Sequence, residues 1–164
     1  MSDTKDWKHL SEDEWKKRLS SESFRVKIRA EFLWKVCRRA GTETAGTGTY
    51  NKHHSKGYYK CICCGTRLFS SKQKFDSGTG WPSYFEHDGH VARKGKGSGF
   101  FGVEVICDTC DAHLGHVFTD GPAPTHLRYC INSVCLDFVA DDTESLNPHF
   151  KSSAGGAKDA CTIL

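Results

Sequence analysis

The sequence predicts a mainly β fold with helices at its N-terminus, and three features lead to that prediction. Apolar residues in the first part of the chain recur at helical spacing, whereas the part that follows reads as short strands separated by glycines. Two Cys-x-x-Cys turns lie in this second part and suit a metal site that ties distant hairpins together. A chain of 164 residues is long enough for one such core, so no second domain is needed.

Residues 1–40 form the predicted N-terminal helical extension. Ser11 and Glu14 match a capping box, in which the two side chains satisfy free N–H groups at the start of a helix. An apolar stripe then follows one helix face, and Gly41 stands where the helix is expected to end. The stripe consists of Phe24, Ile28, Phe32, Val36 and Ala40.

Residues 41–140 form the predicted β domain, and residues 141–164 a polar, flexible tail. Loop-forming residues fill the segment from Thr42 to Lys56, and short strands are expected from there to Val139. The glycine- and lysine-rich segment from Arg93 to Gly99 is expected to be a hairpin loop.

Charge and cysteine content narrow the class of protein. Twenty-three basic residues against twenty acidic ones are spread along the chain, which predicts no nucleic-acid or membrane-surface partner. The first thirty residues lack a secretory apolar run and carry too many acids for a transit peptide, so a cytoplasmic location is expected. Nine cysteines, an odd number without a signal peptide, favour metal ligands and reactive thiols over disulfides.

The two Cys-x-x-Cys turns predict one structural Zn²⁺ per chain, because four thiolates complete a closed tetrahedral site. The turns are further apart than the roughly 15 to 20 residues of a compact zinc ribbon, so the ion would join two hairpins of a larger domain. A redox-active Cys-x-x-Cys or two buried thiol pairs are the alternatives. Cys63, which lies inside the first turn, is expected not to bind the metal. The four predicted ligands are Cys61, Cys64, Cys107 and Cys110.

The segment from Leu127 to Phe138 has the β-branched and aromatic character of a strand, which would place Arg128, Cys130 and Asn132 on one face. A neighbouring guanidinium favours the thiolate form, so Arg128 could activate Cys130 as a nucleophile. On an extended strand, at ~3.3 Å per residue, Cys135 would lie about 16 Å from Cys130, too far for a disulfide. The alternative is that Cys130 is one more buried thiol.

His113 and His116 follow Cys110 directly. If the four cysteines complete the zinc site, both imidazoles are free to act as an acid toward a substrate oxygen. The alternative for each is a solvated or packed histidine.

Five stretches in this order resemble the methionine-R-sulfoxide reductases, the B type of peptide methionine sulfoxide reductase. They are Tyr59 to Cys64, Phe75 to Ser83, Cys107 to Phe118, Asp120 to Thr125 and Arg128 to Ser133.

The resemblance implies a barrel-like domain of two antiparallel sheets, zinc on the four cysteines and attack by Cys130. It assigns polar active-site positions to His113, His116, Arg128 and Asn132, and it gives Trp81 the role of receiving the substrate's methyl group. Asp76 and Ser77 belong to the same pocket-forming motif. Taken alone, Trp81 would more often be a core residue and Asp76 a turn residue.

The implied reaction reduces the R epimer of methionine sulfoxide in oxidised peptides or proteins. Cys130 would attack the sulfoxide sulfur, a histidine would protonate the oxygen, and Cys130 would remain as a sulfenic acid. Thioredoxin or another thiol would then restore it. A monomer is expected.

The sequence departs from the family at Thr79, where many members carry the resolving cysteine. Cys37 and then Cys161 are the candidates to replace it, with Cys63 third, and direct reduction by a small thiol is the alternative. The terminal Cys161-Thr162-Ile163-Leu164 also matches a prenylation box, so a membrane contact is expected only if Cys161 carries the lipid. The competing function is a noncatalytic zinc-binding interaction module, which leaves Cys130 unexplained.

Overall fold

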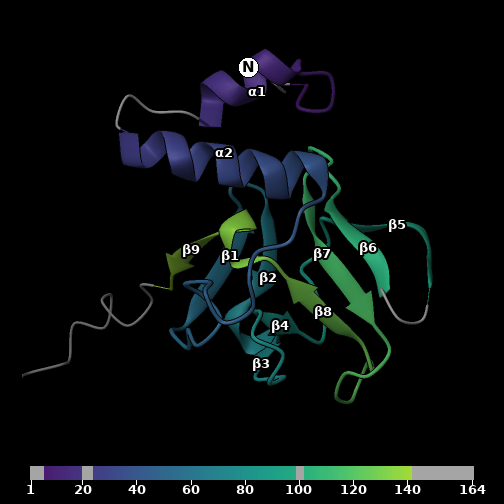
Figure 1. The fold of residues 1–164 in the computed structure, drawn as a ribbon. Coiled ribbons are helices and arrows are strands. Elements are labelled where there is room, and N and C mark those ends of the chain that lie inside the picture. The colour runs from purple at the N-terminus through teal and green to yellow at the C-terminus, as the bar shows by residue number, and fades with distance from the viewer. Residues whose placement is uncertain (1–5, 20–23, 99–101, 142–164) are drawn as a thin grey trace, which may run out of the picture.

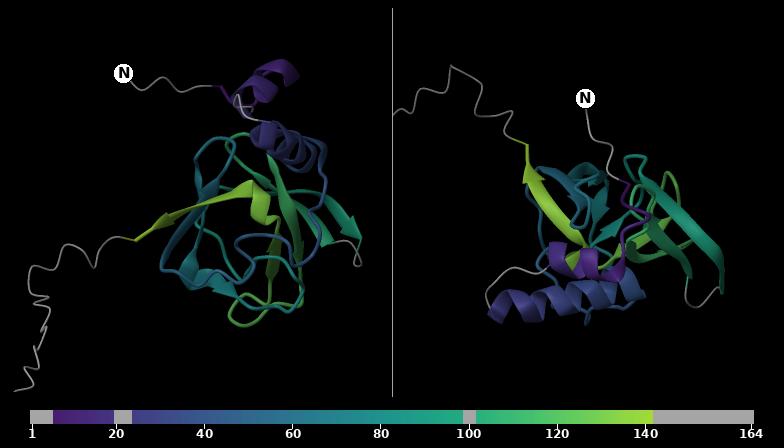
Figure 2. Two further views of the ribbon diagram at one scale, coloured as in Figure 1. Left: turned by 60° about the vertical axis from the view of Figure 1, so that its left-hand side comes forward. Right: turned by 90° about the horizontal axis from the view of Figure 1, so that it is seen from above.

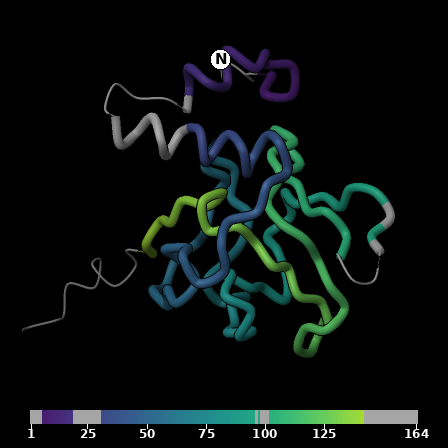
Figure 3. Tube along the Cα trace, viewed as in Figure 1, coloured from purple at the N-terminus to yellow at the C-terminus, as the bar shows by residue number. Residues whose placement is uncertain are grey.

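The computed structural model describes residues 6–19, 24–98 and 102–141. Two helices, α1 (Glu12–Leu19) and α2 (Phe24–Arg39), lie together on one side of the β domain (Figures 1 and 2). Figure 3 traces the same path as a tube, from α1 in purple to the last strand in yellow-green. The expected flexible tail and the prenylation box at Cys161 fall in 142–164, outside the described residues.

The strands form two antiparallel sheets, as predicted, and neither closes on itself within the described ranges. The smaller sheet has the order β2 (Arg67–Ser70), β1 (Gly57–Cys61) and β9 (Leu136–Ala140). The larger sheet carries the remaining strands in the order β3 (Lys74–Phe75), β4 (Ser83–Tyr84), β8 (Arg128–Ile131), β7 (His113–Phe118), β6 (Gly102–Cys107) and β5 (Val91–Ser98).

The prediction of one continuous strand from Leu127 to Phe138 is wrong. A 3-10 turn, η2 (Ser133–Cys135), separates β8 from β9 and sends the chain from the larger sheet to the smaller one. The cause is tertiary, because the carboxylate of Glu43 accepts the N–H groups of Ser133 and Val134 at 2.6 and 3.0 Å. The distance expected between Cys130 and Cys135 on an extended strand therefore does not apply.

The helical prediction is confirmed at the cap and corrected on the buried face. Glu14 accepts from the N–H of Ser11 at 2.8 Å, and Ser11 Oγ accepts from the N–H of Glu14 at 3.3 Å, which completes the capping box. On α2 the described buried residues are Leu33, Val36 and Cys37, whereas Phe32 is 41% exposed. Val36 of the predicted stripe is therefore buried, but Phe32 is not, and Leu33 and Cys37 are buried beside Val36.

The segment predicted as a loop from Arg93 to Gly99 is mostly strand. β5 extends to Ser98 and pairs with β6, with an irregularity in register between Lys94 and Ser98. Glycine there weakens strand propensity, but pairing with β6 outweighs it. No helix in the described ranges is long and apolar enough to cross a membrane.

Candidate active site and metal centre

The four cysteines predicted as zinc ligands lie together at the ends of two strands from different sheets. Their sulfur atoms all lie within 4.8 Å of one another, with 3.8 Å between Cys61 and Cys110 and 3.7 Å between Cys64 and Cys107. Zn–S bonds of about 2.3 Å in a tetrahedron place sulfurs about 3.8 Å apart, so the observed spacing fits a zinc ion.

The two turns that carry these cysteines are built alike. In the first turn Gly65 donates its N–H to Cys61 O at 2.8 Å, and in the second Asp111 donates to Cys107 O at 2.9 Å. Gly65 and Asp111 both have positive φ, +81° and +55°, which closes each turn. Cys63 is fully buried and is not one of the four clustered sulfurs, as expected of a cysteine that does not bind the metal.

A pocket of about 290 Å³ opens beside Cys130 on β8. Strand pairing determines the neighbours of Cys130, because it lies opposite His116 on β7 and opposite Ser83 on β4. The pocket is lined by Thr42, Trp81, Gly115, His116, Phe118, Cys130 and Asn132. The structure therefore brings four of the residues predicted from the sequence to one cavity.

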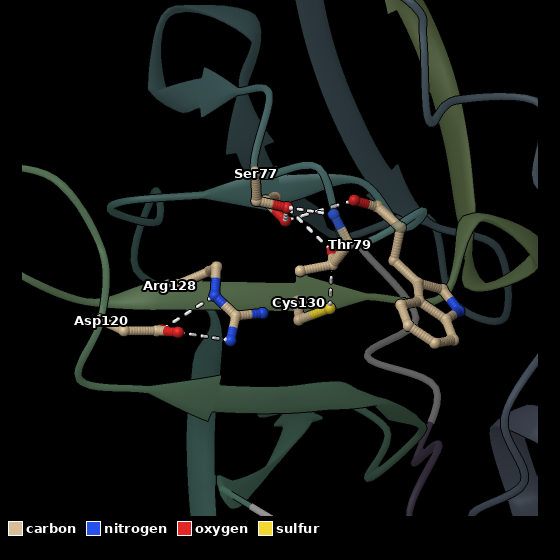
Figure 4. A network of polar contacts seen from close by, with 7 residues as sticks. Ser77, Thr79, Asp120, Arg128 and Cys130 are labelled. Atoms are coloured by element: carbon tan, nitrogen blue, oxygen red, sulfur yellow. Dashed lines mark hydrogen bonds and ion pairs between the residues drawn. The ribbon is translucent and has the colours of Figure 1, made fainter. Parts of the chain in front are cut away.

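Burial raises the pKa of the Cys130 thiol above its usual value, and Thr79, Arg128 and Ser83 oppose the shift. Thr79 Oγ1 lies 3.8 Å from Cys130 Sγ, and the positive charge of Arg128 also favours the thiolate. Arg128 is itself held by Asp120 through two hydrogen bonds of 2.8 Å each (Figure 4). Arg128 thus acts in the predicted direction, but burial outweighs it.

The two histidines occupy different environments. His116 lines the pocket, and burial together with the charge of His113 lowers the pKa of its imidazole. His113 is buried behind it, with ring centroids 5.3 Å apart, and its Nδ1 lies 2.9 Å from Glu104 Oε1. Nothing local in the sequence pairs Glu104 with His113, because the contact depends on the pairing of β6 with β7.

Glu43, 4% exposed, organises one wall of the pocket, a role that sequence reasoning missed. Its N–H donates to Asn132 Oδ1 at 3.0 Å, and its carbonyl accepts the indole N–H of Trp81 at 3.1 Å. Asn132 Nδ2 also donates to Leu114 O at 3.0 Å. Glu43 lies in the segment from Thr42 to Lys56 that the sequence marks only as a loop.

Hydroxyl groups form a chain on the other side of Cys130. Ser77 Oγ lies 2.8 Å from Thr79 Oγ1 and 2.7 Å from Ser83 Oγ (Figure 4). Asp76 is exposed, and its carboxylate accepts the N–H of Gly78 at 2.9 Å, which makes it a turn residue in this structure. Ser77 thus connects to Cys130 through Thr79, whereas Asp76 does not line the pocket.

Cys37, the first candidate for the resolving thiol, lies on α2 in the core. Its sulfur contacts Cys135 Sγ at 3.0 Å, and both side chains are buried. The side chain that contacts Cys130 Sγ at the family's resolving position is the hydroxyl of Thr79.

Comparisons with a family model and with individual known proteins match this chain to the same family. The SelR domain family model matches residues 30–140. A "Peptide methionine sulfoxide reductase MsrB" from Thioalkalivibrio sulfidiphilus is 52% identical over 125 residues, covering 74% of this chain and 90% of the relative. Proteins of the same name from Pseudomonas fluorescens and a Synechococcus species are 49% and 47% identical, covering 77% and 78% of this chain and 92% and 89% of those relatives.

Proposed function

Because the chain belongs to the SelR family of peptide methionine sulfoxide reductases, we propose that it reduces the R epimer of methionine sulfoxide with Cys130 as its nucleophile. The chain is an oxidoreductase that acts on sulfur, and its substrates are oxidised peptides or proteins, with a thiol as the reductant. The observation that carries the assignment of Cys130 is its place beside His116 in the pocket.

In the first step the Cys130 thiolate attacks the sulfoxide sulfur and bonds to it. This sulfur–sulfur bond and the sulfur–oxygen bond then break as the oxygen moves to the Cys130 sulfur. The oxygen takes a proton and ends on Cys130 as a sulfenic acid, so Cys130 loses two electrons and the substrate sulfur gains two. Methionine leaves with its thioether restored. Substrate would displace water from the half-buried pocket, which strengthens the electrostatic attraction between the thiolate and nearby positive charge.

His116 is the proposed acid for this step because it lines the pocket, whereas His113 is buried behind it. Glu104 holds His113 by its Nδ1, and His113 in turn lies edge-on to His116. His113 would then act as a positioning residue. A proton donor next to a thiol nucleophile is what this reaction requires.

The substrate side chain is proposed to rest its methyl group on Trp81, with Asn132 as a neutral donor and Phe118 as part of the apolar wall. All three line the pocket. Trp81 is fixed through its indole N–H and Asn132 through its amide oxygen, both on Glu43, so the wall is rigid before substrate arrives.

In the second step a thiol attacks the Cys130 sulfenic acid, which releases water and forms a disulfide; a second thiol then returns Cys130 to its reduced state. Thioredoxin or a small thiol is the proposed source. Cys37 and Cys161 stay candidates for the first of these thiols. Cys37 would need α2 to release it from Cys135, because the two sulfurs are in contact in the core.

One Zn²⁺ is proposed to bind Cys61, Cys64, Cys107 and Cys110. It would complete a tetrahedron with no open position, and so would supply stability and no step of the reaction. Its effect would be to join the end of β1 to the end of β6, in two different sheets. The alternative of a noncatalytic zinc module is excluded, because the family is one of enzymes.

The mass of the protein after one turnover tests the assignment of the nucleophile. Reduced protein is mixed with the R epimer of a methionine sulfoxide peptide, without added thiol, and then treated with a reagent that traps sulfenic acids. We expect the label on Cys130, and none when Cys130→Ser is treated alike. Label on another cysteine, with Cys130 unmodified, would remove it from this role.

A further inference from the structure

Helix α1 lies outside residues 30–140, which the SelR family model matches, yet it is packed into the protein. Its Trp15 is only 1% exposed and belongs to the same core as the β domain. Trp7, just before the helix, stacks on Trp15 with ring centroids 6.0 Å apart. Figures 1 and 2 show α1 running alongside α2, on the outer side of the molecule. A segment added to the family domain is thus an integral part of this structure.

Cationic side chains from α1, from the residues just before it and from α2 reach both metal-binding turns. Arg18 of α1 donates its Nε–H to the carbonyl of Cys63 in the first turn, at 3.1 Å. Arg38 of α2 donates from Nη1 to the carbonyl of Cys110 in the second turn, at 2.7 Å. Lys8 lies 3.4 Å from the carboxylate of Asp111, next to Cys110. The helices therefore hold the two turns from outside the sheets.

Two tryptophans hold the arginines in place. The guanidinium of Arg18 lies 4.4 Å from the ring centre of Trp7, and that of Arg38 lies 4.6 Å from the ring centre of Trp15. Because the two rings stack on each other, the four side chains form a single stack, with the two rings in the middle and one guanidinium at each end. The arginine side chains are in this way oriented before they bind the carbonyls.

The charge of the site explains why cations belong there. Four thiolates around one Zn²⁺ leave a net charge of about −2, and nearby positive charge stabilises such a centre. Groups that hold the ligands of a metal typically change its affinity by about 10- to 100-fold when they are removed. An arginine on each turn would oppose both the spreading of the turns and the loss of the ion.

We propose that the N-terminal helices of this chain are a clamp that retains the metal, with Arg18 and Arg38 as the side chains that hold the two cysteine turns closed. The proposal rests on the four-cysteine zinc site proposed above. The clamp acts on the rate at which zinc leaves, and it takes no part in the reaction at Cys130.

The test measures zinc release from the full chain. Zinc is first counted in the purified protein, and its release into excess chelator is then followed with a chromophoric zinc indicator. We expect roughly 10-fold faster release for Arg18→Gln and for Arg38→Gln, and a larger increase for the double variant. The matched control is Lys16→Gln on the same helix, since Lys16 contacts Glu12 and Trp34 but neither turn; its release rate should equal that of the wild type.

Equal release rates for Arg18→Gln and Lys16→Gln would overturn the clamp. Arg18 is exposed, so Arg18→Gln carries the test even if Arg38→Gln does not fold. Arg18→Lys keeps the charge but not the planar donor group, and we expect an intermediate rate for it. A wild-type protein that purifies without zinc would contradict the metal site itself. Zinc that is present but leaves the variants at the wild-type rate would contradict only the clamp.

Discussion

Glu43 and Asn132 are joined by a 3.0 Å hydrogen bond from the main-chain N–H of Glu43 to the side-chain oxygen of Asn132. The same residue accepts the indole N–H of Trp81 on its carbonyl and two N–H groups of η2 on its carboxylate. Glu43 therefore fixes two residues that line the pocket and also turns the chain out of β8. One buried residue thus couples the fold of the β8–β9 connection to the shape of the substrate pocket.

Glu43→Gln should damage both stability and catalysis. The glutamine keeps one acceptor, but it directs an amide donor at the N–H of Ser133 or Val134. Losing a charged hydrogen bond costs about 1.5–3 kcal/mol of unfolding free energy, and a comparable loss in the transition state would lower kcat/KM by about 10-fold or more. Denaturant unfolding and steady-state kinetics measure the two effects.

The control for this variant is Glu86→Gln, which changes an exposed carboxylate. A Glu43→Gln enzyme with wild-type kcat/KM would show that the pocket wall does not depend on the carboxylate of Glu43.

The pH dependence of kcat/KM should report an acid limb from His116 and an alkaline limb from Cys130. Burial lowers the pKa of His116 from 6.5 and raises that of Cys130 from 9.0. Between these two pH values the neutral imidazole of His116 and the neutral thiol of Cys130 therefore predominate. The active thiolate and imidazolium form is then a small, constant fraction over that range, and it decreases outside it. We expect a broad bell with its acid limb below pH 6.5 and its alkaline limb above pH 9.0.

His116→Gln should lower kcat by about 100-fold or more, the usual contribution of a general acid. It should also replace the bell by a single rise with pH up to the raised pKa of Cys130, because only the thiolate then titrates. His113→Gln should keep part of the activity, because His113 does not line the pocket. A bell with an alkaline fall that persists in His116→Gln would assign the proton to another group.

Thr79→Cys should give the chain an internal resolving thiol. Thr79 Oγ1 is already in contact with Cys130 Sγ, at 3.8 Å, so a cysteine sulfur there needs to move by less than about 2 Å to reach the length of a disulfide. After one turnover without added thiol, we expect a disulfide between residues 79 and 130, detected by mass spectrometry of an unreduced digest. Thr79→Ser, which keeps only the hydroxyl, is the control, and a free thiol at both positions of the cysteine variant would contradict the geometry.

Removal of the metal should loosen the connection between the two sheets. Cys107→Ser should lose the ion and several kcal/mol of stability, about 10 °C or more in Tm. Cys63→Ala, also buried but outside the four-sulfur cluster, should keep one zinc per chain. Metal content and thermal unfolding measured together distinguish these outcomes. Loss of zinc in Cys63→Ala but not in Cys107→Ser would show that Cys63, and not Cys107, is a metal ligand.

The sequence predicted those parts of the fold and site that short motifs carry. The two antiparallel sheets are confirmed. The clustering of the four cysteines is confirmed as well, because it follows from two local turns and from the four ligands that a zinc site needs. The break between β8 and β9 could not be predicted, because Ile131 to Leu136 has strand character and the turn depends on Glu43, far away in sequence. Glu104 and Asp120 were missed for the same reason, since each meets its partner only through the pairing of strands or the return of a loop.

The zinc clamp shows a different limit of sequence reasoning. The capping box of α1 was visible in the sequence, and the helix was predicted from it. The sequence did not predict that Arg18 reaches the carbonyl of Cys63, because this contact needs the packing of Trp15 into the core.

The most direct test of the account is turnover of the separated R and S epimers of a methionine sulfoxide peptide by wild type and Cys130→Ser. Each is assayed with dithiothreitol and then with thioredoxin. We expect turnover of the R epimer alone and its complete loss in Cys130→Ser. Turnover of the S epimer, or R-epimer activity that survives in Cys130→Ser, would contradict it.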